Sequence, residues 1–236
     1  MLTHQVVFWD RRLSPVEHQF QVLKRVGIAH FDETIELWTE PESDAYISRE
    51  LDASAKGATK RRVGLVLGAS PRWPTKQWPV ERFLELSKQL VRRFDCQIVL
   101  LGTEEDQKQA RLFDESNLKQ VLNLTGKTSF AQLVSLIKQL DVLVTGDTAP
   151  LHMASAFKTK IVALFGPTEP KRHMPPGKGH IALVKRIPCQ PCYSGTCTNP
   201  DKLLCLREIS VNEVLEAVGR QFELTSPPLF KAELTI

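Results

Sequence analysis

Polar and charged residues that could bind a phosphorylated ligand follow the ends of several apolar segments in this sequence. Lys76 could supply a point charge for a phosphate, and Asp147 and Thr148 stand just before a stretch with the composition of a helix. If the apolar segments are strands of one parallel sheet, these side chains gather at its carboxyl edge, where α/β proteins bind ligands. The complete set is Ser70, Lys76, Glu104, Glu105, Thr128, Asp147, Thr148 and His152.

Taken one at a time, these residues have ordinary structural explanations. Lys76 could be a solvated loop residue, Asp147 only a helix cap, and His152 only a partly buried helix residue. Their joint placement on one rim favours a binding site. The two commonest nucleotide fingerprints, G-x-G-x-x-G after a strand and G-x-x-x-x-G-K-[ST], do not occur, so the sequence predicts a phosphate site of another kind.

The stretch 141–170 predicts how the phosphate side of this rim is built. Residues 142–144 are a continuous apolar run, which is typical of a strand buried on both faces. Asp147 or Thr148 can cap a helix that has Pro150 in its first turn and continues to residue 157. Residues 161–165 return as the next buried strand. Such a unit places a helix N-terminus, with its N–H groups and positive dipole end, at the carboxyl edge of the sheet.

The sequence from residue 62 onward alternates in the same way and predicts the fold class. Apolar runs at 63–67, 97–101, 121–124 and 181–184 are expected strands, the last of them at a sheet edge. Helices are expected at about 79–94, 104–116, 130–140 and from Ser210 onward. Strands and helices that alternate over ~100 residues or more predict an α/β fold, a Rossmann-like parallel sheet with helices on both faces.

The first sixty residues follow a different pattern. Short strands are expected at 6–9 and 35–38, and Ser14-Pro15-Val16-Glu17 has the signature of a helix start, with Gly27 at the end of that helix. A second, charged helix is expected from Thr39 and Pro41 to about residue 51, followed by a small, polar linker at 53–60. These are too few strands for an independent domain, so this portion is expected to be the closing part of another one.

Composition excludes several classes of protein. The 31 Lys and Arg residues against 27 Asp and Glu give a net charge of +4, an excess too small to predict nucleic-acid binding. The chain has 236 residues, of which 42% are hydrophobic, so it can bury a core without the disulfides or metal ions that small domains need. No run approaches the ~18 apolar residues of a membrane span, and the start lacks the features of a signal peptide. The cytoplasm is therefore the expected compartment, where cysteines are not read first as disulfides.

Four cysteines form a second constellation: Cys189, Cys192, Cys197 and Cys205. Thiols at this spacing, in short loops with Pro and Gly, could close tetrahedrally around a structural zinc ion. The alternatives are free thiols or occasional pairs, because the gap between the cysteine pairs is shorter than in most zinc folds. The fifth, Cys96, stands at the start of the expected strand at 97–101 and is predicted to be a core residue.

Three motifs in order resemble glycosyltransferase family 9, the ADP-heptose:lipopolysaccharide heptosyltransferases and their relatives. They are G-A-S…K-x-W-P-x-E-R-F at 68–83, G-D-T-A-P-x-H-x-A-S-A at 146–156 and F-G-P-T-x-P at 165–170. The resemblance covers roughly residues 62–222. It implies the C-terminal half of a GT-B fold, in which two Rossmann-like domains face each other across a cleft and the C-terminal one holds the nucleotide-sugar.

The resemblance also implies roles for single residues. Lys76 would face the donor phosphates with Ser70 in the same loop, and Glu105, or alternatively Glu104, would hold the ribose. Asp147, Thr148 and His152 would contact the diphosphate and the transferred sugar, with Thr128 and Ala149 also at the donor. Ala149 stands where the family usually has glycine, so the approach of the backbone to the ligand is expected to differ slightly there. No metal cofactor is required for catalysis by this resemblance.

The beginning of the sequence departs from the family pattern. The family has an N-terminal domain of ~150 or more residues that holds the acceptor and supplies an aspartate general base, whereas only its closing elements are recognised here. The expected division is therefore 1–55 for that remnant with its linker and 56–236 for the nucleotide-sugar-binding domain. Asp10 follows no recognisable family motif and is not assigned as the base, and the catalytic residue stays unknown.

Three functions remain open at this point. The first is a glycosyltransferase of the heptosyltransferase type, acting on a lipid-linked or lipopolysaccharide-core acceptor at the inner membrane surface, with a separate chain completing the cleft. The second is a nucleotide-sugar-binding fragment without catalysis, because the acceptor domain and its base are missing. The third is a metal-binding interaction module centred on the cysteines. The basic residues around 171–173 could meet donor phosphate or an anionic acceptor, or could simply be solvated.

Overall fold

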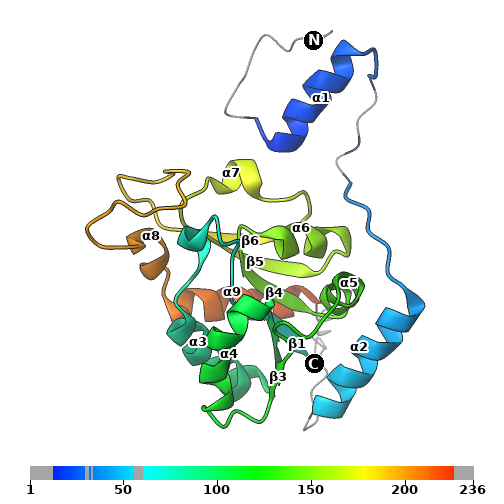
Figure 1. The fold of residues 1–236 in the computed structure, drawn as a ribbon, viewed down its shortest axis with the longest axis vertical. Helices are drawn as coiled ribbons and strands as arrows, with labels where there is room; N and C mark the ends of the chain where they lie inside the picture. The colour runs from blue at the N-terminus through cyan, green and yellow to red at the C-terminus, as the bar shows by residue number, and fades with distance from the viewer. Residues whose placement is uncertain (1–12, 30–31, 33, 56–60, 226–236) are drawn as a thin grey trace, which may run out of the picture.

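A parallel six-stranded sheet forms the centre of the molecule, which a computed structural model describes over residues 13–29, 32, 34–55 and 61–225 (Figure 1). Its strands are β1 (Arg62–Val66), β2 (Gln97–Leu101), β3 (Val121–Asn123), β4 (Val142–Gly146), β5 (Lys160–Phe165) and β6 (Ile181–Val184). They lie in the order β3-β2-β1-β4-β5-β6, and every neighbouring pair is parallel. The chain winds outward from β1 in one direction and from β4 in the other, which leaves a crevice at their carboxyl ends.

Helices cover both faces of this sheet. One face carries α3 (Val80–Phe94), α4 (Gln107–Asp114), α8 (Leu204–Arg207) and α9 (Val211–Thr225), and the other carries α2 (Pro41–Ser54), α5 (Phe130–Lys138) and α6 (Ala149–Ala156). Alternate residues of β2 serve the two cores: Ile98 and Leu100 pack in the first, Val99 and Leu101 in the second. The predicted α/β class, with a parallel sheet and helices on both faces, is confirmed.

The helix α1 (Pro15–Arg25) lies apart from the sheet, beside the short helix α7 (Pro170–His173) (Figure 1). Its start has the capping box that the sequence indicated: the Glu17 N–H donates to Ser14 Oγ over 3.1 Å, and the Ser14 N–H donates to Glu17 Oε2 over 2.6 Å. His18 and Val22 of α1 line a surface cavity together with Arg172 of α7. Residues of α1 and α7 therefore border the same surface cavity.

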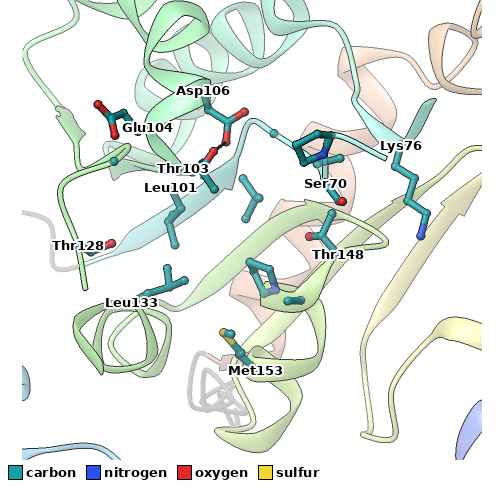
Figure 2. A pocket seen from close by; sticks show the side chains of 18 of the residues that line it. Ser70, Lys76, Leu101, Thr103, Glu104, Asp106, Thr128, Leu133, Thr148 and Met153 are labelled. Carbon is teal, nitrogen blue, oxygen red and sulfur yellow. Dashed lines mark hydrogen bonds between the residues drawn. The ribbon is translucent and has the colours of Figure 1, made fainter. Parts of the chain in front are cut away.

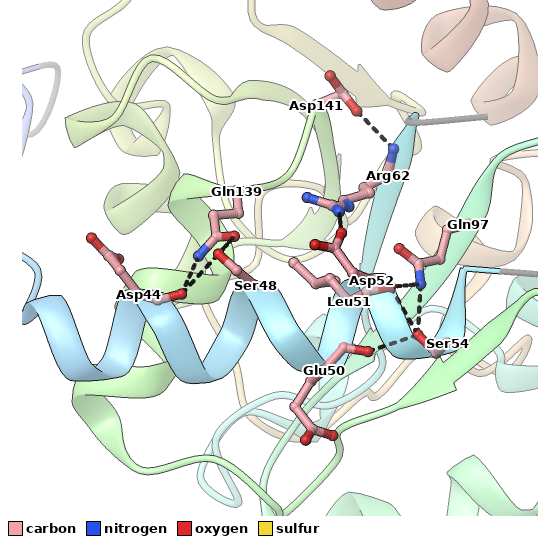
Figure 3. Close-up of polar contacts among 10 residues, drawn as sticks. All are labelled: Asp44, Ser48, Glu50, Leu51, Asp52, Ser54, Arg62, Gln97, Gln139 and Asp141. Carbon is pink, nitrogen blue, oxygen red and sulfur yellow. Dashed lines mark hydrogen bonds and ion pairs between the residues drawn. The ribbon is translucent and has the colours of Figure 1, made fainter. Parts of the chain in front are cut away.

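Helix α2 packs directly on the sheet (Figure 3). Ile47 and Leu51 are fully buried in the core that α2 shares with α5 and α6. At the end of α2, the Gln97 side-chain amide donates to the Leu51 carbonyl over 2.8 Å and to Ser54 Oγ over 2.7 Å. Because Gln97 opens β2, these bonds attach the end of α2 to the amino edge of the sheet.

A second set of polar contacts joins α2 to α5. The Ser48 hydroxyl lies 2.9 Å from Gln139 Oε1, and the Lys138 ammonium lies 2.9 Å from the Asp44 carboxylate. The Lys138 ammonium also donates to Thr39 just before the helix. By packing, residues 41–54 therefore belong to the core of the sheet domain, while the proposed division at residue 55 stays a prediction.

Two local predictions differ from the structure. The strand predicted at 35–38 is not formed, because the sheet ends at β3 and β6 and this segment meets neither edge, and an unpaired strand has no partner for its backbone groups. The linker predicted at 53–60 begins later than expected, since residues 53 and 54 complete α2. The strand predicted at 6–9 and residues 56–60 lie outside the described residues. Between 104 and 116, the expected helix opens as a 3₁₀ turn, Glu104–Asp106, and ends at Asp114.

Candidate nucleotide-sugar site

A cavity of about 570 Å³ opens at the carboxyl ends of β1, β2 and β4, in the crevice where the winding direction changes (Figure 2). Its lining comes from the loop after β1, the turn after β2, the start of α5 and the first turns of α6. Its volume falls in the range typical of small-molecule sites. The sheet topology alone would place a ligand here, because β1 and β4 are the adjacent strands from which the chain winds in opposite directions.

Lys76 and Asp147 form an ion pair at one side of this cavity. The Lys76 ammonium lies 2.7 Å from Asp147 Oδ2, and the two side chains are only 15% and 6% exposed. Lys76 comes from the 3₁₀ turn Pro74–Lys76 and Asp147 from the residue after β4. The ammonium also lies 4.7 Å from the centre of the Trp73 ring, a distance at which a cation is attracted to the face of an aromatic ring.

The close approach of the Lys76 loop to β4 depends on Gly146. A Cβ atom at residue 146 would lie 2.7 Å from the Lys76 carbonyl oxygen, which is closer than the van der Waals radii of the two atoms allow. Any side chain here would push away the turn that carries Lys76. The glycine of the G-D-T motif therefore lets the loop of one strand rest on the end of another.

The N-terminus of α6 faces the same side of the cavity. Thr148 is the residue before the first turn, and its side chain caps no backbone N–H; its hydroxyl lies 3.0 Å from the Thr145 hydroxyl instead. The first N–H groups of a helix have no partner within the helix, and they carry its positive dipole end. Ala149 and Pro150 follow in the cavity wall. Lys76 and this helix end together supply a point charge and directional donors for an anion.

The opposite side of the cavity carries acidic and hydroxyl groups. Figure 2 shows Glu104 and Thr128 on this side, across the pocket from Lys76. The buried Asp106 does not point freely into the cavity, because its carboxylate accepts from the Thr103 N–H over 2.8 Å and from the Thr103 hydroxyl over 3.0 Å. Asp106 therefore holds the turn after β2, and Glu104 is left as the exposed carboxylate of the lining that could accept hydrogen bonds from sugar hydroxyls.

Between these two sides the wall is apolar. Val66 and Leu101 end β1 and β2, Leu133 and Phe130 come from α5, and Met153 comes from α6. Phe130 is 68% exposed although it is a large apolar residue, so its ring is free to contact a ligand. An apolar wall flanked by polar groups suits a nucleobase, whose faces are apolar and whose edge is polar.

Two histidines lie near the ion pair without lining the cavity. Partial burial lowers the pKa of His152 below its ordinary value of 6.5; the Lys76 cation lowers it further and the Asp147 carboxylate opposes the change. Burial likewise lowers the pKa of His173 in α7, with Lys76, Arg172 and His152 adding to the effect and Asp147 opposing it. Both imidazoles are therefore neutral near pH 7 and could donate or accept one hydrogen bond at each nitrogen.

The structure thus brings together most of the residues predicted from the sequence. Seven line the cavity: Ser70, Lys76, Glu104, Thr128, Asp147, Thr148 and Ala149. Glu105 and His152 do not line it, although His152 lies one helical turn after Thr148 and feels the charges of Lys76 and Asp147. Sequence reasoning missed Trp73 and the apolar wall. Trp73 had a signal, since it stands three residues before Lys76 in a loop after a strand.

The cysteines lie elsewhere, around a second and much smaller cavity of about 30 Å³. All four are free thiols. Over the part of the chain that the structure describes, no three His, Cys, Asp or Glu side chains stand in positions to hold a metal ion as they are. Over the same residues, no helix is long and apolar enough to cross a membrane.

Comparison with known proteins places these features in a family. Residues 3–203 match the family model described as glycosyltransferase family 9 (heptosyltransferase). The lipooligosaccharide heptosyltransferase 2 of Campylobacter jejuni is 29% identical over 161 residues, which are 66% of this chain and 50% of that protein. The chain spans between 33% and 51% of the length of the first curated relatives that it matches.

Solved structures resemble the fold as well. The Escherichia coli ADP-heptose lipopolysaccharide heptosyltransferase II is 25% identical, with a TM-score of 0.63 over 80% of this chain and 54% of that one. A glycosyltransferase family 9 protein from Veillonella parvula has a TM-score of 0.76 over 90% of this chain and 61% of its own, at 20% identity. The second likeness concerns the fold alone.

Proposed function

This chain belongs to glycosyltransferase family 9, and on that premise we propose that its large cavity binds a nucleotide-diphosphate sugar, with ADP-heptose as the first candidate. The observation that carries the proposal is the division of the cavity into three chemical regions. Lys76 and the start of α6 lie at one side, an apolar wall lies in the middle, and Glu104 lies at the other side. A nucleotide sugar has matching parts: a diphosphate, a flat base and a ribose with hydroxyls.

The donor is proposed to lie with its diphosphate against Lys76 and the N-terminus of α6. There the Lys76 ammonium and the helix N–H groups neutralise the phosphate charge, and the same groups stabilise the charge that develops when the diphosphate leaves. The ribose hydroxyls donate to Glu104, and the base lies on the apolar wall. Glu105 does not contribute to this lining, so Glu104 is preferred for the ribose.

The sugar to be transferred is proposed to extend past the ion pair toward His152 and His173. Both imidazoles are close enough to feel Asp147 and Lys76, and their lowered pKa keeps them neutral, so they act as hydrogen-bonding groups and carry no charge near pH 7. Asp147 is held by Lys76 and is therefore assigned to positioning of Lys76 and of the sugar. It is not assigned as the base.

The proposed reaction transfers the heptosyl group to a hydroxyl of a lipopolysaccharide-core or related glycan acceptor, with release of the nucleoside diphosphate. That step needs a base to deprotonate the acceptor hydroxyl. No residue described here is given that role, and Asp10 lies outside the described residues. A lipid-linked acceptor would bring the protein to the cytoplasmic face of the inner membrane as a peripheral protein.

The alternative function is donor binding without catalysis. It is favoured by one observation, that no residue among those the structure describes is assigned as the general base. In this case the cavity holds the donor as proposed, but no acceptor is activated.

Binding and turnover measured on the same preparation separate the two functions. Calorimetry with ADP-heptose, ADP and adenosine tests the cavity, and release of ADP in the presence of a lipopolysaccharide-core acceptor tests transfer. Binding with turnover supports the transferase, and binding without turnover supports the fragment. If neither ADP-heptose nor ADP binds at millimolar concentration, the proposal for the cavity is wrong.

A further inference from the structure

The segment 189–205, here called the cysteine loop, surrounds one small cavity with four thiols. Cys189, Cys192, Cys197 and Cys205 all line this space of about 30 Å³. A space of that size holds one water molecule or one ion. Four thiols around a space for one ion are the donor set that zinc and iron prefer.

Hydrogen bonds to sulfur already orient this loop. The Leu203 N–H lies 3.3 Å from Cys197 Sγ, and the Asn199 side-chain amide lies 3.4 Å from Cys189 Sγ. Donors aimed at sulfur stabilise a thiolate more than a thiol, because the thiolate carries the negative charge.

The thiols do not yet converge on one point. Among the described residues no three metal-binding side chains are placed to hold an ion as they stand, so a site requires the Sγ atoms to turn inward. Rotation about the Cα–Cβ bond between staggered positions is the movement that the proposal requires of each cysteine.

We propose that the four thiolates bind one divalent thiophilic cation, zinc or iron. We also propose that the closed site rigidifies the cysteine loop, which then acts as a brace: it holds in place the turn that carries Lys76 and the F-G-P-T turn. Binding releases the four thiol protons to solvent while four metal–sulfur bonds form, with no change of oxidation state. The cation takes no part in sugar transfer.

The first contact of the brace reaches the turn that carries Lys76. Thr75, which is buried, donates from its hydroxyl to the Ser194 carbonyl over 2.6 Å. Beside it, a Cβ atom at Gly195 would lie 2.2 Å from the Arg72 carbonyl oxygen, so only glycine lets the two loops meet this closely. The residue after Thr75 is Lys76 itself, and movement of the cysteine loop therefore moves the ammonium group.

The second contact reaches the F-G-P-T turn and α7. The Tyr193 N–H donates to the Pro167 carbonyl over 2.9 Å, and the Gln190 side-chain amide donates to the Gly166 carbonyl over 2.6 Å. The Tyr193 ring lies 5.7 Å from the ring of His173. Tyr193 directly follows Cys192, so the proposed metal site and the histidine that borders the ion pair are joined through one residue.

Metal content is the first test and needs no donor. The full chain is purified under reducing conditions without chelator, titrated separately with Zn²⁺ and Fe²⁺ under anaerobic conditions, desalted and measured by elemental mass spectrometry. One equivalent of zinc or of iron per chain is expected, and it should be lost in Cys192→Ser and Cys197→Ser. Cys96→Ala is the matched control, since Cys96 lies in the core near β2 and should leave metal content unchanged.

Less than about a fifth of an equivalent after both titrations would overturn the site, and so would two disulfides found by intact mass in the reduced preparation. Because these readouts involve no nucleotide, their failure is distinct from failure of the donor proposal.

The brace is tested by hydrogen exchange of the same chain before and after removal of the metal by chelation. Removal should speed exchange in 68–78 and 166–173 by about tenfold or more, with little change in β2 and β3. Unchanged exchange in both segments would overturn the brace. Thr75→Val adds an independent check: it removes the bond to Ser194 and keeps the thiols, so one equivalent of metal should remain while the affinity for ADP falls several-fold.

Discussion

The Lys76 ammonium and the Asp147 carboxylate lie 2.7 Å apart although 71 residues separate them in the sequence. The pair joins the turn after β1 to the end of β4, the two strands between which the sheet changes direction. The pair is also mostly shielded from water, so each charged group is stabilised mainly by the opposite charge of its partner. A diphosphate that binds here meets a cation that is already oriented by a carboxylate on one side and by Trp73 on the other.

Lys76→Ala should weaken binding of the diphosphate far more than binding of the nucleoside. Charge-assisted hydrogen bonds contribute about 1.5–3 kcal/mol, so affinity for ADP should fall about 10- to 100-fold. Affinity for adenosine, which has no phosphate, should change less than about threefold. Lys88→Ala on the exposed side of α3 is the control and should change neither. Equal losses for ADP and adenosine would contradict the phosphate role.

Asp147→Asn should destabilise the ligand-free protein and increase the stabilisation by a diphosphate. The substitution leaves the Lys76 cation shielded and without its anion, which costs about 3 kcal/mol or more for a buried pair. Bound ADP supplies the missing negative charge. Thermal melts should show a lower Tm without ligand and a larger rise with saturating ADP than in the unsubstituted chain. A Tm that is lower by the same amount with and without ADP would show that Asp147 is only structural.

Stability should fall when the pH is lowered from about 7 through the lowered pKa values of the partly buried histidines. Burial lowers the pKa of His152, His173 and His180 below 6.5, so the unfolded chain binds protons at these positions more readily than the folded one. Above the unfolded value all three are neutral in both states and the effect vanishes.

His180→Gln gives the sharpest check of this pH dependence, because His180 lies away from the nucleotide cavity. Melts at pH 7.5, 6.5 and 5.5 should show a smaller loss of Tm toward acid in this variant than in the unsubstituted chain. An identical slope in both would exclude His180 as a contributor.

Leu51→Ala should destabilise the whole sheet domain, whereas Val22→Ala should not. Leu51 of α2 is fully buried, and removal of such a side chain costs about 2–5 kcal/mol. Val22 of α1 is 53% exposed, and its truncation should cost less than about 0.5 kcal/mol. Urea unfolding followed by circular dichroism measures both. If Leu51→Ala left the midpoint unchanged, α2 would not be part of the cooperative unit.

Most of the sheet could be predicted because its strands are buried on both faces. Runs such as Ile98 to Leu101 have no polar residue. The helices between them begin with capping residues that can be recognised in the sequence, such as Ser129 with Gln132. Residues 35–38 are also predicted as a short strand, yet form none. Whether such a segment finds a partner strand depends on the free edges of the sheet, which local sequence does not specify.

The polar part of the site could be predicted as well, whereas its apolar part could not. Residues at strand ends, such as Lys76 and Asp147, follow from the rule for parallel sheets. The apolar wall could not be recognised, because Val66 and Leu101 are indistinguishable in sequence from the rest of their strands. Glu104 and Glu105 look equivalent in sequence as well. Both belong to the 3₁₀ turn that Asp106 holds, and in the structure only Glu104 is part of the cavity lining.

The contacts of α2 have a consequence for how the chain is made. Ser48 finds Gln139 across 91 residues, and Asp44 finds Lys138 across 94. A ribosome that adds about 5–20 residues per second needs roughly 5–20 s to synthesise that interval. Until then Ile47 and Leu51 have no α5 to pack against, and one face of a nascent helix stays open to water and to other apolar surfaces. Helix α2 therefore completes its core only after α5 has been synthesised, and chaperone binding to the nascent chain should concentrate on this segment.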